Sequence, residues 1–126
     1  MTKFNVLSTI AIVTTLVSCS GSDQYRGTWK ATDTKGNKYE ITFQEKSFDV
    51  KDSLGTSNNY DYTQHSVEIQ NGTKTYGIKL SDGRGYKIQF PNSENMNIGF
   101  ILDENGAGVY TIGKSDYVQY EDIYKL

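Results

Sequence analysis

The stretch TYGIKLSDGRGYKIQF, residues 75–90, contains two runs of alternating apolar and polar residues joined by a glycine-rich segment. In the runs 76–80 and 86–90 every second residue is large and apolar: Tyr76, Ile78, Leu80, Tyr86, Ile88 and Phe90. A period of two is typical of a β-strand that has one buried face and one wet face. Residues 82–85, Asp-Gly-Arg-Gly, are turn formers. The stretch therefore predicts two antiparallel strands joined by a tight turn.

The same pattern recurs along the chain. Alternating runs lie at residues 39–44, 48–51 and 67–69, and turn-forming clusters at 35–37, 71–72, 92–95 and 104–106. Turns spaced by roughly ten residues are typical of an antiparallel sandwich or barrel. We expect an all-β domain, an antiparallel meander of about eight to ten strands. It forms either a small up-and-down barrel, which has no exposed edge strands, or a sandwich.

Two segments depart from simple alternation. Residues 52–59 have the weakest periodicity, so we expect the longest loop there. Residues 97–102, Asn-Ile-Gly-Phe-Ile-Leu, are apolar on both faces. We expect this strand to be covered on both sides, for example beneath a returning C-terminal segment at residues 117–124.

The N-terminus has the features of an export signal. Lys3 precedes a mostly apolar run at residues 6–17, which is too short to span a bilayer. The run ends in Leu16-Val17-Ser18-Cys19, and Cys19 is the single cysteine of the chain. This box resembles the lipobox of bacterial lipoproteins. The resemblance implies cleavage before Cys19, a diacylglycerol on its thiol and acylation, such as palmitate, of the new amine.

The lipoprotein resemblance also predicts the domain organisation and the location. Residues 1–18 would be a signal peptide, 19–24 a lipidated tether and 25–126 a single all-β domain. Ser20 stands where an aspartate would hold many Gram-negative lipoproteins at the inner membrane, so the outer membrane is expected, on its periplasmic face or at the cell surface. The sequence Cys-Ser-Gly-Ser-Asp after the cleavage point loosely resembles the export signals of Bacteroidetes surface lipoproteins.

A short motif opens the first strand of the expected domain. Gly27-Thr28-Trp29 resembles the Gly-x-Trp signature at the start of lipocalins, fatty-acid-binding proteins and avidins, together called calycins. The resemblance implies that Gly27 and Trp29 close the base of a β-barrel. In these families a late arginine often packs on the tryptophan. We expect no counterpart here, because the last strands contain only Lys114 and Lys125.

Composition and motifs give little support for catalysis. His65 is the one histidine, so no two-histidine metal set exists, and a solvated turn is its expected place. Residues 103–106, Asp-Glu-Asn-Gly, predict a hairpin turn and lack a full set of calcium ligands. The formal net charge is −2 and no basic patch is visible, which disfavours nucleic acid as a partner. We expect a protein that is not an enzyme and needs neither metal nor cofactor.

The aromatic residues leave two functions open. A barrel of eight strands is filled by side chains or holds one small ligand. We expect eight rings to point inward and to fill most of the barrel: Trp29, Tyr39, Phe43, Phe48, Tyr76, Tyr86, Phe90 and Phe100.

Tyrosines on other strand faces are candidates for an interaction surface: Tyr60, Tyr62, Tyr117 and Tyr120. We therefore expect a membrane-anchored module that binds an envelope or secreted protein, such as an envelope-complex subunit or an inhibitor or immunity lipoprotein. The alternative is a lipocalin-like carrier of a small apolar ligand.

One modification site is also expected. Asp52-Ser53-Leu54 matches the short Asp-Ser/Thr-aliphatic acceptor pattern for O-glycosylation of exported Bacteroidetes proteins. Ser53 is the acceptor. An unmodified Ser53 in intact-mass data from the native organism would argue against this hypothesis.

The lipobox predicts the effect of Cys19→Ser. We expect the precursor to stay uncut by the lipoprotein signal peptidase and to lack lipid, because both reactions use the thiol. Membrane fractionation and intact-mass measurement check this. A variant that matures and stays with membranes as the wild type does would show that the resemblance is misleading.

Overall fold

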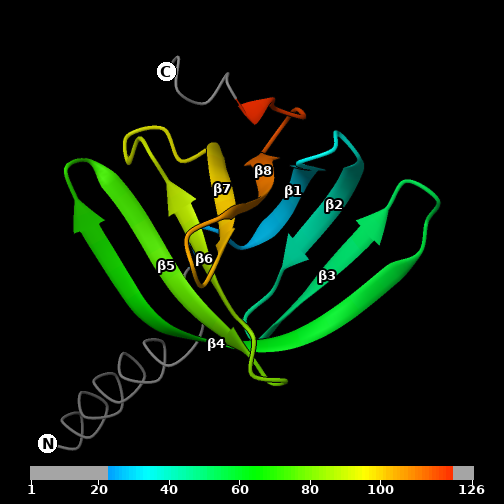
Figure 1. Ribbon diagram of the computed structural model, residues 1–126, viewed down its shortest axis with the longest axis horizontal. Helices are drawn as coiled ribbons and strands as arrows, with labels where there is room; N and C mark the ends of the chain where they lie inside the picture. The colour runs from blue at the N-terminus through cyan, green and yellow to red at the C-terminus, as the bar shows by residue number, and fades with distance from the viewer. Residues whose placement is uncertain (1–22, 121–126) are drawn as a thin grey trace, which may run out of the picture.

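The computed structural model describes residues 23–120, which contain eight β-strands (Figure 1). In chain order the strands are β1 (Gly27–Asp33), β2 (Lys38–Phe43), β3 (Ser47–Asp52), β4 (Ser57–Gln70), β5 (Thr73–Leu80), β6 (Gly85–Phe90), β7 (Ile98–Asp103) and β8 (Gly108–Gly113). Each strand pairs with the next in antiparallel fashion, and β8 pairs with β1 to close a barrel. The expected all-β meander is therefore confirmed, as a barrel rather than a sandwich.

Closure of the barrel is visible at Ala31, which pairs with Tyr39 of β2 on one side and with Ile112 of β8 on the other. β4 is the longest strand, and it bends along the lower edge of the view in Figure 1. Its first part pairs with β3 up to Asp61, and its second part pairs with β5 from Tyr62 onward. One bent strand thus joins the two sides of the barrel.

The meander has two ends, which we call the mouth and the base. The mouth carries the four turns 33–37, 52–56, 80–84 and 103–107, which connect each odd-numbered strand to the next. The base carries the other connections, 44–46, 71–72 and 91–97, and the N-terminal residues 23–26. The turn predicted at Asn71-Gly72 is confirmed, and both residues have positive φ, 53° and 79°, as in the tight turns that suit a β-hairpin.

The core fills the base half of the barrel. Its buried side chains belong to one cluster that includes several packed rings: Tyr25, Trp29, Phe43, Phe48, Tyr62, Tyr76 and Phe90. Tyr25 is at its centre, with ring centroids 5.4 Å from Phe43 and 4.9 Å from Tyr76. Edge-to-face pairs of this kind are favourable beyond their buried area. Tyr25 was not predicted, because it precedes the first alternating run.

Trp29 links the N-terminal segment to the residue that follows the last strand, β8. Its Nε1 donates a hydrogen bond of 2.8 Å to the carbonyl oxygen of Tyr25. The Nζ of Lys114 lies 4.5 Å from the Trp29 ring centroid, in a cation–π contact, and donates a hydrogen bond of 3.1 Å to the carbonyl oxygen of Arg26. The expectation that the late arginine of calycins has no counterpart is therefore wrong, since Lys114 packs on Trp29 in its place. Lys114 follows β8 directly, and β8 pairs with β1, so its ammonium group reaches the ring.

A C-terminal segment covers the outer face of β7 and β8. The hydroxyl of Thr111 donates a hydrogen bond of 2.6 Å to the carbonyl oxygen of Val118, and the rings of Phe100 and Tyr120 lie 5.5 Å apart. Phe100 is buried by this outer layer and lies outside the main core cluster, so its expected inward direction is wrong. The prediction that the strand at 97–102 is covered on both sides is confirmed, since Ile101 belongs to the core. Residues 121–126 lie outside the described part of the chain.

The expected long loop at residues 52–59 is wrong. β3 extends to Asp52 and β4 begins at Ser57, so only the four residues 53–56 connect them. The weak alternation at 57–60 arises because the outer face is wet and the inner face lines a cavity rather than the core. The connection 91–97 between β6 and β7 is longer.

The packing of Trp29 predicts a large loss of stability in Trp29→Ala. The ring is fully buried, and its removal should lower the free energy of unfolding by about 3–5 kcal/mol. Denaturant unfolding measures the loss. The fluorescence emission maximum of the wild-type indole should be blue-shifted, as it is for a buried indole. Ile69→Ala is the matched control, because Ile69 is 67% exposed and its truncation should change stability by less than about 0.5 kcal/mol. Equal midpoints for Trp29→Ala and the wild type would contradict this account of the base.

Candidate functional site at the mouth of the barrel

The mouth opens into a cavity of about 230 Å³. Apolar side chains of the inward strand faces form its walls: Ile41, Phe43, Phe48, Val50, Ile78, Leu80 and Ile101. Four tyrosines form its rim: Tyr39, Tyr60, Tyr86 and Tyr110. Each rim tyrosine comes from a different even-numbered strand, close to the turn that precedes the strand. A cavity with apolar walls and a few convergent polar groups is the usual form of a binding site.

Three of the four turns at the mouth share one construction. Each has the pattern Asp-x-x-Gly-x, beginning at Asp33, Asp52 and Asp103. In each, Oδ1 of the aspartate accepts hydrogen bonds of 2.9–3.0 Å from the backbone N–H groups two and four residues later. The glycine at the fourth position has φ near 90°, which a residue with a side chain rarely adopts. These turns are therefore short and fixed by their own aspartates.

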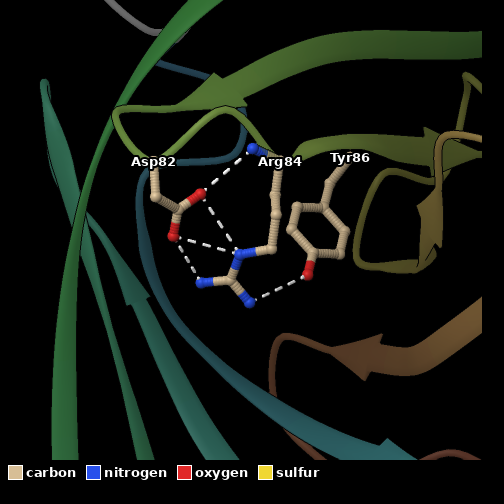
Figure 2. Close-up of polar contacts among 3 residues, drawn as sticks. All are labelled: Asp82, Arg84 and Tyr86. Atoms are coloured by element: carbon tan, nitrogen blue, oxygen red, sulfur yellow. Dashed lines mark hydrogen bonds and ion pairs between the residues drawn. The ribbon is translucent and has the colours of Figure 1, made fainter.

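The fourth turn, 80–84, has the same backbone bonds but places its aspartate at a different position. Figure 2 shows the contacts of this aspartate, Asp82, with Arg84. Leu80 occupies the first position, and Asp82 instead accepts hydrogen bonds from the backbone N–H and the guanidinium of Arg84. The guanidinium nitrogen is 2.8 Å from the Asp82 carboxylate. The hydrogen bonds from Arg84 hold the pKa of the Asp82 carboxyl below its usual value, so both groups stay charged at neutral pH.

Arg84 also contacts two rim tyrosines. Its guanidinium carbon is 5.4 Å from the centroid of the Tyr60 ring, within the range of a cation–π contact. One guanidinium nitrogen is 3.5 Å from the Tyr86 hydroxyl, a long hydrogen bond that Figure 2 shows. The face of a rim tyrosine therefore accepts a cation in this structure.

Two of the rim tyrosines, Tyr39 and Tyr110, have a raised pKa and are neutral at physiological pH. Burial, with the nearby phenol of Tyr39 and carboxylate of Asp33, raises the pKa of Tyr110 to about 12. The hydrogen bond that Tyr39 donates to Oδ2 of Asp33, at 3.1 Å, raises the pKa of Tyr39. The Tyr39 and Tyr110 rings meet edge to face at 5.3 Å. This pair therefore offers two uncharged phenols as hydrogen-bonding groups at the rim.

The four tyrosines proposed for a contact surface do not lie together. Tyr60 is half-buried at the rim. Tyr62 is buried in the core, and its hydroxyl donates a hydrogen bond to the carbonyl oxygen of Gln44, so its proposed place in a contact surface is wrong. Tyr117 lies on the outside, with Nζ of Lys30 and of Lys38 about 5 Å from its ring centroid. Tyr120 is 57% exposed on the outer layer.

The sequence did not predict the rim. Tyr39 and Tyr86 face inward as expected, but both line the cavity rather than fill the core. Tyr110 and Arg84 were not singled out. A usable signal was present, because each turn glycine at this end is followed within a few residues by an inward tyrosine.

The remaining predicted site residues lie elsewhere. Gly27 and Trp29 are at the base, and Ser53 is exposed in the turn 52–56 at the mouth. Cys19 lies outside the described residues. His65 is exposed, but it lies at an irregularity within β4, between Gln64 and Ser66, rather than in a turn between strands. Among residues 23–120 there is no group of three histidine, cysteine or acidic residues that could hold a metal ion.

Comparison of the chain with protein-family models, with curated proteins and with solved structures found no match. Within the described range, no helix is both long enough and apolar enough to cross a membrane.

The turn construction predicts a pH-dependent contribution from Asp33. Burial raises the pKa of its carboxyl, but hydrogen bonds from Asn37, Lys35 and Tyr39 outweigh burial and hold the pKa below the usual 3.8. A lowered pKa stabilises the fold above the pKa of the unfolded chain, and this stabilisation disappears as pH falls through the folded value. We expect Asp33→Asn to lower the free energy of unfolding by about 1 kcal/mol at pH 7. The effect is limited because the carboxyl is exposed to solvent.

The loss in Asp33→Asn should shrink below pH 3.8, because the wild-type carboxyl then becomes protonated. Urea unfolding of the wild type and of Asp33→Asn between pH 7 and pH 2 measures the gap between their free energies of unfolding. Asp116→Asn, on the exposed surface, is the control and should show little effect at any pH. A gap for Asp33→Asn that stays constant over this range would contradict the prediction.

Proposed function

We propose that this chain is a non-enzymatic binding module of the bacterial envelope, and that its mouth engages a side chain of another protein. The observation that carries the proposal is the cavity at the mouth, with its apolar walls and tyrosine rim. We further propose that lipid on Cys19 tethers the module to the outer membrane, on the strength of the lipobox resemblance.

The size of the cavity favours a protein partner. Pockets for small-molecule ligands and cofactors usually measure about 300–1,000 Å³. The mouth cavity is about 230 Å³ and is open to solvent, so it suits one or two side chains presented by a larger surface. Anchor residues that fill such pockets supply much of the affinity of protein interfaces.

The surroundings of the cavity also favour a protein partner. Tyrosines, which contribute large contact area at low entropic cost, are enriched at protein interfaces. Leu54, in the turn 52–56 beside the cavity, is 89% exposed and would extend an apolar contact beyond the rim. The tight turns hold the rim in place before binding, which reduces the ordering cost of association.

The tether would present the mouth to partners. The chain enters the barrel at the base, where Tyr25 is buried, and Cys19 precedes Asp23 by four residues. Four residues span at most about 14 Å. A lipid on Cys19 would therefore keep the base close to the membrane, with the mouth at the opposite end of the barrel.

The second candidate function is a lipocalin-like carrier of a small apolar ligand. The cavity itself favours it, as do the eight-stranded meander, which is consistent with a calycin-like fold, and the contact of Trp29 with a late basic residue. Against it stand the packed base half of the barrel and the small volume of the cavity.

Site-specific photo-cross-linking in the native host tests the proposal. A photoreactive residue at Leu54 should give one discrete protein adduct, whereas the same residue at Ile69, another exposed aliphatic position at the base, should not. Val50→Trp, which fills the cavity from its wall, should abolish the Leu54 adduct while the melting temperature stays near that of the wild type. An adduct at Leu54 that persists in a folded Val50→Trp variant would contradict a role for the cavity.

Titration with dodecanoate separates the two candidate functions. A carrier should bind it saturably, and its melting temperature should rise with the logarithm of the ligand concentration above Kd, because the ligand binds and stabilises the folded state. For the binding module we expect no such shift. A saturable thermal shift that Val50→Trp removes would favour the carrier.

A further inference from the structure

We propose that the mouth selects a partner segment in which an apolar anchor residue is flanked by basic residues. This inference rests on the proposed function and adds the charge of the partner. The apolar side chain would enter the cavity, and its lysine or arginine neighbours would lie against the tyrosines and carboxylates of the rim.

The polarity of the cavity lining changes from its depth to its rim, and this change determines where each side chain of the partner lies. The walls deep in the cavity, such as Phe43 and Ile78, are apolar, so a charged head placed there would lose its hydration without a partner. The polar groups are at the rim, where Tyr39, Tyr60, Tyr86 and Tyr110 present ring faces and hydroxyls. An apolar anchor therefore belongs inside, and its polar neighbours belong at the rim.

The charge at the mouth favours cations. The four turns, residues 33–37, 52–56, 80–84 and 103–107, contain five acidic residues against two basic residues. One of the two basic residues, Arg84, is paired with the Asp82 carboxylate in the same turn. The remaining excess of negative charge attracts a basic partner segment and disfavours an acidic one.

Asp52 is placed to make the charged contact directly. It lines the cavity, and its Oδ1 is used by the N–H groups of Leu54 and Thr56. Among residues 23–120, no hydrogen bond reaches its Oδ2. The carboxylate therefore keeps one oxygen for an incoming ammonium or guanidinium group.

The structure already contains an example of the proposed contact. The guanidinium of Arg84 lies over the Tyr60 ring at the rim, 5.4 Å from its centroid. Cations over tyrosine faces are stabilised by the ring quadrupole, and more strongly where water is excluded. A partner's basic side chain would use the same chemistry on the rim tyrosines.

Three blocked peptides test the inference on the full-length mature protein: acetyl-Lys-Leu-Lys-amide, acetyl-Gln-Leu-Gln-amide and acetyl-Glu-Leu-Glu-amide. Binding is measured from NMR shifts of the Leu54 and Tyr60 amides. We expect the lysine peptide to bind about five- to tenfold more tightly than the glutamine peptide, and the glutamate peptide to bind most weakly. The preference should fall as salt is raised, because charges at the rim are screened.

Two variants isolate the charge from the fold. Asp52→Asn keeps an Oδ1 acceptor for the turn, so the turn stays intact while the charge is lost. It should reduce the preference for the lysine peptide about two- to threefold, whereas the surface control Asp116→Asn should leave it unchanged. Arg84→Met should increase the preference for the lysine peptide, because it removes a cation and uncovers the Tyr60 ring.

The outcomes separate this inference from the proposed function. Equal shifts of the mouth by all three peptides, or no shift by the lysine peptide, would overturn the basic-partner inference while the Leu54 adduct still supports a protein-binding mouth. Tightest binding by the glutamate peptide, lost in Arg84→Met, would overturn it in favour of an acidic partner. Absence of the adduct would instead contradict the proposed function.

Discussion

The contact between Trp29 and Lys114 links the first strand of the barrel to the end of the last, and it fixes the N-terminal segment on which the packing of the base depends. Trp29 is on β1 and Lys114 directly follows β8, so this side-chain pair adds to the backbone pairing of β1 with β8 at the junction where the meander closes. The indole N–H binds the Tyr25 carbonyl and the ammonium group binds the Arg26 carbonyl, so the N-terminal segment is fixed beneath the barrel. With Tyr25 held there, its ring fills the base and buries the neighbouring aromatic residues.

A consequence of this closure is that stability and binding use different parts of the barrel. The base holds the densely packed rings, while the mouth holds a cavity whose tyrosines are only partly buried. The mouth turns obtain their order from local hydrogen bonds to aspartates rather than from the core. Side chains at the mouth are therefore available for contacts that the core does not need.

The sequence predicted the strands well, because burial of one sheet face requires a period of two, and that requirement is local. It could not predict where along the barrel an inward residue lies. Tyr39 and Tyr76 show the same alternation in the sequence, yet Tyr76 is buried at the base and Tyr39 lines the mouth. Their positions depend on the stagger between strands, which only the closed barrel defines. Phe100 was misplaced because its strand is apolar on both faces, so the sequence pattern does not tell which face points inward.

The repeated turns have a consequence for how this barrel can change. In the turns that begin at Asp33, Asp52 and Asp103, the first aspartate and the glycine set the backbone, and the side chains of the two residues between them take no part in it: 34–35, 53–54 and 104–105. These positions lie in the turns at the mouth and can accept many side chains without loss of the turn. The mouth is thus suited to rapid divergence among descendants of this chain, and to randomised libraries in which new recognition is selected on an unchanged barrel.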